Sequence, residues 1–396
     1  MECLRPLHRG GARTPRVSVV MPLYNLEATV AAALGSLQGQ TFEDWEAIVV
    51  DDGSTDAGPS EAAAAARRDS RVRLVQQANA GVCAARAHGL SLAGGDLVMF
   101  LDADDELLPE GLERLVAAAD AGASGDGPCG AFGGFALVSE RGAVLDRVRP
   151  QRARLGLDCL LGSVFVAVHS VVTPTALARR VGFRAQLPGA DGAGPVPNRV
   201  EDTDYLLRLG LCGLGWANAG AEVCRYVVRS GSRSGAWGQM LAATRACYTD
   251  AYAQAERAGL RGRVDASADR LGLVLTKAAW GYATRRAILA DSVALDEAAA
   301  LLAGVRPEPR VDEQLLVHMG RRAVNLALRS AARFESPARP PQWAGALAAW
   351  WERCVGMGLI GRDTARLAQR LLTDLCAHVP SVAVPAGAAL RSERAA

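Results

Sequence analysis

Acidic side chains gather where two apolar runs of the chain end. One set follows residues 96–101 and consists of Asp102, Ala103, Asp104 and Asp105. The other follows residues 46–50 and opens with Asp51 and Asp52. Neighbouring carboxylates favour a divalent cation, and Mg²⁺ or Mn²⁺ is typically held by one or two carboxylates together with substrate phosphates. The second set is suited to accept hydrogen bonds from a ribose or a base. The alternative is that aspartate and glycine after strands only form turns.

A third acidic cluster begins at Glu201 and Asp202 and leads into an apolar pattern of helical spacing. This spacing predicts the first turn of an amphipathic helix. Acidic residues stabilise a helix N-terminus through the macrodipole, which alone is a sufficient reason for the cluster. The functional interpretation is a general base that the helix delivers into a cleft.

The elements that must position these carboxylates alternate between strand and helix. Apolar runs at 17–21, 46–50, 72–75 and 96–101 predict buried strands, and helical patterns lie between them. Continuous apolar strands that alternate with helices predict a parallel sheet covered on both faces. Ligands of such α/β sheets bind beyond the carboxyl ends of the strands. Both aspartate sets are predicted to lie at this edge.

The order of these motifs resembles the family 2 glycosyltransferases of the GT-A fold. The resemblance begins with Val17-Ser-Val-Val-Met-Pro-Leu-Tyr-Asn25 and continues through 41–56, where the chain reads up to Asp-Asp-Gly-Ser-Thr-Asp56. Asn79-Ala-Gly81, Ala85-Arg86, 100–105 and Glu201-Asp202 follow in the same order as in that family. The similarity extends over roughly residues 16–235, and it implies a Rossmann-like, mostly parallel, doubly wound sheet.

The resemblance also implies a donor and a reaction. The donor would be a nucleotide-diphosphate sugar, with a UDP-sugar favoured, and transfer would invert the anomeric carbon. By position, the nucleoside would be bound by Pro22, Tyr24, Asp52 and Arg86. Asp102, Ala103 and Asp104 would form the DxD motif that holds the ribose and a Mg²⁺ or Mn²⁺ ion, with Asp104 as the more direct ligand. Asp202 would be the catalytic base, with Glu201 beside it.

The chain departs from the family pattern after the base. Many relatives carry a histidine before a Gly-Ser turn, and that histidine is able to reach the metal, whereas this chain has Arg229 before Gly231-Ser232. An arginine does not ligate a cation but hydrogen-bonds a diphosphate, so we expect Arg229 on the donor and a less secure dependence on metal. His169 and Asp105 are expected on the acceptor side. For His169, a purely structural role is an equally good alternative.

Composition excludes other classes of function. Forty-four basic residues balance forty-two acidic ones, and the net charge of +2 offers no general attraction to nucleic acid. Nine cysteines at scattered spacing without a CxxC pair argue against a disulfide framework and a cysteine zinc site. Five histidines without ligand spacing argue against a histidine-based metal site. With no signal-peptide pattern and no long apolar run, we expect a cytoplasmic protein without a transmembrane segment.

Four regions are predicted along the chain. They are a flexible arm at 1–15, the GT-A domain at 16–235, an all-helical domain at 236–385 and a tail at 386–396. The helical domain is expected either to hold the acceptor, which is a glycan, a peptide or a small metabolite, or to form a homo-oligomer. An alternative for the whole chain is a GT-A-fold carbohydrate-binding or scaffold protein without catalysis. A nucleotidyltransferase is disfavoured because Pro22-Leu-Tyr-Asn25 is not a basic, glycine-rich loop.

Overall fold

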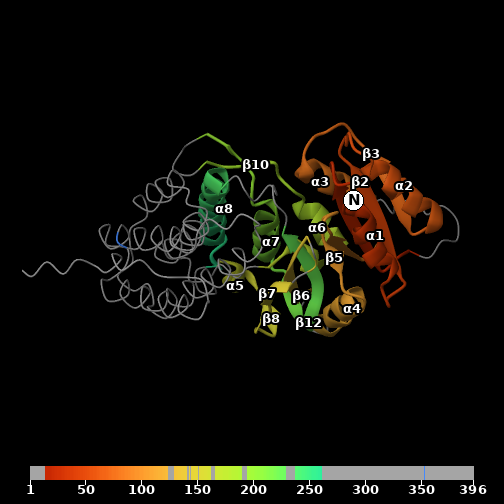
Figure 1. Cartoon of the computed structure of the whole chain (residues 1–396). Coiled ribbons are helices and arrows are strands. Elements are labelled where there is room, and N and C mark those ends of the chain that lie inside the picture. The colour runs from red at the N-terminus through yellow and green to blue at the C-terminus, as the bar shows by residue number, and fades with distance from the viewer. Residues whose placement is uncertain are drawn as a thin grey trace, which may run out of the picture. The chain divides into compact units, whose positions relative to one another are not determined.

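A computed structural model describes residues 14–260, apart from 124–128, 141, 143, 150, 162–165, 190–193 and 229–236, together with Glu352. The chain divides into two compact units, the first of which comprises 1–160, 164–185 and 201–229. All carboxylates of the predicted site belong to this first unit. Figure 1 labels helices and strands of the described residues. Arg229, the tail, nearly all of the arm and most of the predicted helical domain lie outside the described residues. The domain boundary at 235 therefore stays a prediction.

Four parallel strands form the core of the first unit in the order β3-β2-β1-β4. They are β1 (Val17–Leu23), β2 (Trp45–Asp51), β3 (Val72–Gln76) and β4 (Leu97–Phe100). The helices between them are α1 (Val30–Gln38), α2 (Gly58–Arg68) and α3 (Val82–Leu92). The strands coincide with the predicted runs because strands covered on both faces are mostly apolar, and β1 and β4 are buried at every position.

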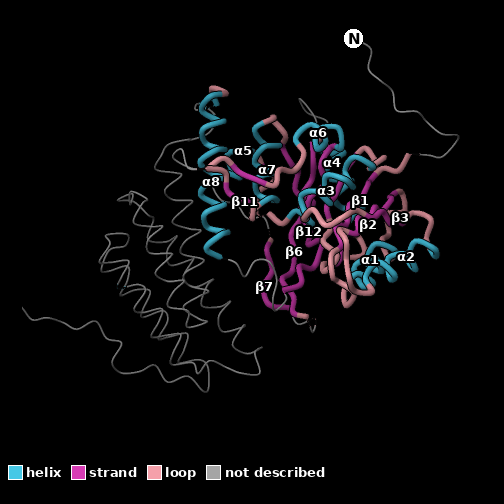
Figure 2. The backbone as a smooth tube through the Cα atoms, turned by 90° about the horizontal axis from the view of Figure 1, so that it is seen from above, coloured by secondary structure: helices cyan, strands magenta, loops and turns pink. Residues whose placement is uncertain are grey.

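Helices cover both faces of this parallel core. One face packs against α1 and α2, where Ala47 and Val49 share a cluster with Leu34 and Ala62. The other face packs against α3, where Ile48 and Val50 contact Ala85 (Figure 2). Alternate residues of β2 thus point to opposite faces. The predicted α/β class, a doubly wound sheet with a parallel core, is confirmed.

The sheet continues beyond β4 with mixed strand directions. Strand β9 runs antiparallel to both β4 and β6, and β12 runs parallel to β6. The remaining strands of the first unit are β5 (Glu106–Leu107), β6 (Cys129–Ser139), β7 (Val144–Val148), β8 (Arg154–Leu155), β9 (Val171–Pro174) and β12 (Gly215–Val228). The remaining helices are α4 (Gly111–Gly122), α5 (Leu157–Leu161), α6 (Thr175–Val181), α7 (Glu201–Leu211) and the 3₁₀ turn η1 (Val168–Ser170). Strand β9 begins at Val171 and no earlier, because Ser170 turns back to bond the carbonyl of Ala167.

The described part of the second unit contains β10 (Gln186–Leu187), β11 (Val196–Pro197) and α8 (Trp237–Arg257). Helix α8 lies in the segment predicted to be helical, and it buries one stripe that consists of Ala243, Cys247, Ala251 and Ala255. Among the described residues, no helix combines the length and the apolar character that a membrane span requires.

The strand register brings the first two acidic sets to one edge. Leu23 at the end of β1 pairs with Asp51 on β2, and Val20 of β1 pairs with Phe100 at the end of β4. The carboxyl ends of β2 and β4 therefore flank the end of β1. This is the edge at which α/β sheets bind ligands.

Candidate active site

The turn after β4 places its aspartates in different surroundings. The Asp105 N–H closes the turn by donating to the carbonyl of Asp102 at 3.0 Å. The side chains of Asp102 and Asp104 are partly exposed, whereas Asp105 is buried and Ala103 lies fully inside the core. Alternation along the turn thus directs two carboxylates outward and one inward, so Asp102 and Asp104 are the members accessible to a ligand.

Arg86 joins this turn to the start of α7. It lies on α3 with 3% of its surface exposed, and it donates from Nη2 to Asp102 Oδ1 at 2.7 Å and from Nη1 to Glu201 Oε1 at 3.2 Å. Its guanidinium also lies 5.5 Å from the ring centre of Phe183. Burial lowers the pKa of Arg86, but the carboxylates of Asp102 and Glu201 more than offset this, so the group stays charged. Two predicted acidic clusters converge on this one cation.

Asp202 follows Glu201 at the N-terminal turn of α7. Its Oδ1 accepts the N–H of Thr203 at 2.7 Å, and the residue stays partly exposed. Burial of the carboxyl and the neighbouring Glu201 raise the pKa of Asp202, while Arg86 lowers it. The net effect is a raised pKa, which makes the carboxylate a better proton acceptor.

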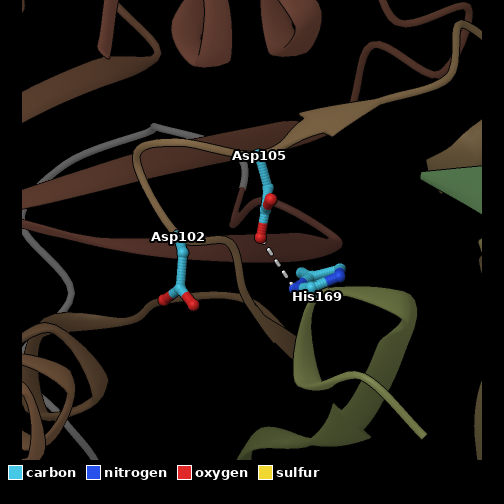
Figure 3. Close-up of side chains that lie close together, drawn as sticks. All are labelled: Asp102, Asp105 and His169. Carbon is cyan, nitrogen blue, oxygen red and sulfur yellow. Dashed lines mark ion pairs between the residues drawn. The ribbon is translucent and has the colours of Figure 1, made fainter. Parts of the chain in front are cut away.

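Behind the turn, Asp105 pairs with His169 of η1. His169 Nδ1 lies 2.9 Å from Asp105 Oδ2, and the side chain of Asp105 points toward the imidazole (Figure 3). The other oxygen of Asp105 accepts the N–H of Val227 at 2.8 Å, which ties the turn to β12. Burial lowers the pKa of His169, but the Asp105 carboxylate raises it well above its ordinary value. Both side chains are buried, and their contact with an acceptor stays a prediction.

One group of side chains has the composition of a cation site. Ligand atoms of Asp102, Asp105 and His169 all lie within 4.8 Å of one another. The group shares Asp102 with the predicted DxD pair but includes Asp105 and His169 in place of Asp104. Carboxylate oxygens suit Mg²⁺ or Mn²⁺. Asp102 is the partly exposed member of this group, so a cation bound here would be reached by a ligand on the side of Asp102.

On the donor side, Asp52 lies buried after β2 and accepts three hydrogen bonds. Gln77 Nε2 and the Ala80 N–H donate to Oδ1, and the Gly81 N–H donates to Oδ2, each at 2.8 Å. Gly81 has a φ of 88°, which glycine adopts without strain at the start of α3. Asp52 therefore joins the loop after β2 to the loop that leads into α3.

The other predicted donor residues lie on β1 and the loop that follows it. Pro22 is buried within β1, and Tyr24 has 48% of its surface exposed. Asn25 adopts a φ of 51°, and its Oδ1 accepts the N–H of Thr55 at 2.8 Å. This bond fastens the loop after β1 to the loop after β2, next to Asp52.

Three residues near these groups were not predicted as site residues. Tyr226 packs its ring 4.9 Å from that of His169, and burial together with Asp105, Asp202, Asp102 and Asp104 raises its pKa. Gln77 and Phe183 contact Asp52 and Arg86 respectively. Tyr226 lies three residues before Arg229, in the segment where many relatives carry a histidine able to reach the metal. Its position in that segment could have identified it as a site residue. No sequence pattern identified Gln77 or Phe183 as a site residue.

Comparison with known proteins decides the family. Residues 18–136 match the model of the family described as glycosyl transferase family 2. This segment belongs to glycosyltransferase family 2. It contains Asp52, Arg86 and the Asp102–Asp105 turn, whereas His169, Glu201 and Asp202 lie beyond it.

Curated relatives match the same part of the chain. The putative glycosyltransferase EpsH of Bacillus subtilis (strain 168) is 38% identical over 106 residues, or 27% of this chain and 31% of that protein. The uncharacterized glycosyltransferase YibD of Escherichia coli (strain K12) is 42% identical over 106 residues, which are 27% of this chain and 31% of that protein. The UDP-Glc:alpha-D-GlcNAc-diphosphoundecaprenol beta-1,3-glucosyltransferase WfgD of Escherichia coli is 36% identical over 102 residues, which are 26% of this chain and 40% of that protein.

These matches cover between 31% and 40% of the length of the three relatives. Among solved structures, S. aureus TarS 1-349 in complex with UDP-GlcNAc aligns with 91% of this chain and 90% of its own, at 16% identity and a TM-score of 0.45. That similarity is too low to carry an argument about function. The family 2 segment therefore contains the carboxylates after β2 and β4, whereas the start of α7 lies beyond it.

Proposed function

We propose that this protein transfers a sugar from a nucleotide-diphosphate donor to an acceptor hydroxyl, with inversion at the anomeric carbon. The observation that carries the proposal is the position of Arg86, which holds the Asp102 turn and the Glu201–Asp202 turn together within one site. A donor-binding carboxylate and a partly exposed carboxylate of raised pKa are thereby brought to the same guanidinium. Inverting transfer needs this pair of functions on opposite sides of the anomeric carbon.

The donor side of the proposal rests on the family 2 segment. Pro22, Tyr24 and Asp52 surround the nucleoside, with Asp52 accepting a hydrogen bond from the base. Asp102 with Asp104 holds the ribose and the metal. A UDP-sugar is the preferred donor, because WfgD, which matches the same segment, is named for UDP-Glc. Arg229 is proposed as a further donor to the diphosphate.

A divalent cation is proposed at the exposed carboxylates. The donor set fits a hard cation, because Asp102 and Asp104 offer carboxylate oxygens at a partly exposed turn. Mg²⁺ or Mn²⁺ bound there would offset the negative charge that develops on the leaving diphosphate. Asp105 and His169 hold the turn from behind and face the acceptor side.

Asp202 is proposed as the general base. As the acceptor oxygen forms its bond to the anomeric carbon, its proton passes to the Asp202 carboxylate. The bond between the anomeric carbon and the diphosphate oxygen breaks, and its electron pair leaves with the diphosphate. Glu201 stays paired with Arg86 and keeps Asp202 at the edge of α7. The acceptor is a glycan, a peptide or a small metabolite, and the proposed compartment is the cytoplasm.

An Asp202→Asn variant tests the base. Asparagine has the same shape but accepts no proton, so we expect transfer to fall by roughly a hundredfold or more while UDP affinity stays near that of the wild type. Release of UDP from a panel of UDP-sugars, with and without acceptor, measures turnover, and calorimetry measures nucleotide affinity. Normal turnover by Asp202→Asn would refute the base. A wild-type protein that releases no UDP from any sugar nucleotide would favour the scaffold alternative.

A further inference from the structure

The hydrogen bonds around Asp52 extend into a chain of three side chains. Gln77 donates from Nε2 to Asp52 Oδ1 at 2.8 Å, and Gln77 Oε1 lies 2.9 Å from His88 Nδ1. Gln77 follows β3, and His88 lies on α3. Both side chains are half-buried, so the chain leads from the surface of α3 to a buried carboxylate.

The chemistry of each group sets the direction of this chain. The carbonyl oxygen of a glutamine side chain only accepts, so His88 must carry a proton on Nδ1 and donate it. The amide nitrogen of Gln77 then faces Asp52. Turning the amide over would put Gln77 Oε1 against a carboxylate oxygen, so the bond to Asp52 would be lost and His88 Nδ1 would have to accept instead of donate. Asp52, which only accepts, therefore sets the orientation of Gln77, and His88 stabilises this orientation as the Nδ1–H tautomer.

The bonds to Asp52 also limit what else it accepts. A carboxylate offers about four acceptor positions, two on each oxygen. Two donors already occupy Oδ1, and the N–H of Gly81 occupies one position on Oδ2. One position on Oδ2 is left. The imide edge of uracil or thymine presents one N–H, whereas guanine presents two parallel donors that need both oxygens.

We propose that Gln77 and His88 are positioning residues that hold Asp52 open to a single imide N–H, and that they thereby select a uridine or thymidine donor against a guanosine donor. The inference rests on the proposed function, in which Asp52 accepts from the base. Gln77 is not needed to join the two loops, because the N–H groups of Ala80 and Gly81 already do so. Its amide fills an acceptor position that a second donor of the base would otherwise take.

Two nearly isosteric variants separate this role from a structural one. In His88→Asn, the amide places a donor near the position of the imidazole Nδ1, so the orientation of Gln77 is kept. In His88→Asp, the side chain has the same size as asparagine but only accepts, so it competes with Asp52 for the amide nitrogen of Gln77. Ser91→Ala is the control on the same helix, because Ser91 only donates to the carbonyl of His88 at 2.7 Å.

The probes are UDP, GDP and 3-methyl-UDP, which lacks the imide N–H, and calorimetry with Mn²⁺ present measures each affinity. We expect wild type to bind UDP roughly tenfold or more tightly than 3-methyl-UDP, since a hydrogen bond to a charged group is lost. His88→Asn and Ser91→Ala should keep the wild-type preference for UDP over GDP, and His88→Asp, which frees an acceptor position on Asp52 Oδ1, should reduce it. In turnover assays, His88→Asp should raise the KM for the donor and leave kcat nearly unchanged.

The inference is overturned if His88→Asp keeps the wild-type ratio of UDP affinity to GDP affinity, or if the wild type binds GDP as tightly as UDP. A wild-type protein that binds no nucleoside diphosphate refutes the proposed function and this inference with it. If the wild type binds UDP but His88→Asp leaves the ratio of UDP affinity to GDP affinity unchanged, this inference alone is refuted and the proposed function stands. Thermal melts establish that each variant folds, and Gln77→Leu gives the same readout if His88→Asp does not.

Discussion

Two parts of the site are held in different ways. Around Asp52, two of the three hydrogen-bond donors are backbone N–H groups, and the partners lie 25 to 29 residues away in the chain. Around Glu201 and Asp202, the tie to the sheet is a contact between charged side chains, and Arg86 lies 115 residues before Glu201. The donor side is therefore held mainly by the fold itself, and the base side by one buried cation.

This difference has an energetic consequence. Backbone donors remain when a side chain changes, so a substitution at Asp52 removes an acceptor without leaving a buried charge. Removing Arg86 leaves two carboxylates without their cation, and Glu201 is buried. A buried charge that loses its partner is far more destabilising than a lost neutral hydrogen bond. We therefore expect donor-side variants to affect binding most, and base-side variants to affect stability as well.

The largest effect on stability is expected for Arg86→Leu. The variant should lower the free energy of unfolding by about 3–5 kcal/mol, because Glu201 and Asp102 lose a shared buried partner. Urea unfolding followed by circular dichroism measures the change. The matched control is the double variant Arg86→Leu/Glu201→Leu, which removes the buried carboxylate as well and should recover part of the loss. If the unfolding midpoint of Arg86→Leu were unchanged, the stability of the base side would not depend on this buried cation, and the proposed difference between the two sides would be wrong.

A smaller effect on stability is expected for Asp52→Asn. One N–H of the loop 77–81 would then face an amide nitrogen, so the loss should be about 1–2 kcal/mol. UDP affinity should nevertheless fall by roughly tenfold or more, because the remaining acceptor position is lost. Parallel unfolding and calorimetry on the same preparations measure both quantities. If Asp52→Asn destabilises the protein more than Arg86→Leu does, the two sides have been assigned the wrong way round.

The same difference explains what the amino-acid sequence predicts. The strands at 17–21, 46–50, 72–75 and 96–101 were predictable because each is mostly apolar and helical patterns lie between them, and the aspartates that follow 46–50 and 96–101 therefore reach the same edge. The contacts of Arg86 with Glu201 and of His169 with Asp105 leave no periodic trace, since each joins distant segments through side chains. Resemblance to a family supplied Arg86 and Asp202 as site residues, but not the buried ion pair that joins their turns. Gln77 and His88 gave no signal for a related reason, because the bond between them depends on the approach of α3 to the end of β3.

The smallest effect is expected where charges pair at the surface. Arg16 donates to both Asp96 and Asp120, so by number of contacts it resembles Arg86. The side chains of these two aspartates are 72% and 55% exposed, however, and water already solvates them. Arg16→Gln should therefore lower the free energy of unfolding by no more than about 1 kcal/mol, and the difference should shrink in 1 M NaCl, where the Debye length is about 3 Å. The loss in Arg86→Leu should persist in that salt, because a buried pair is screened much less. If Arg16→Gln were as damaging as Arg86→Leu, the number of ion pairs rather than their burial would control the stability of the site.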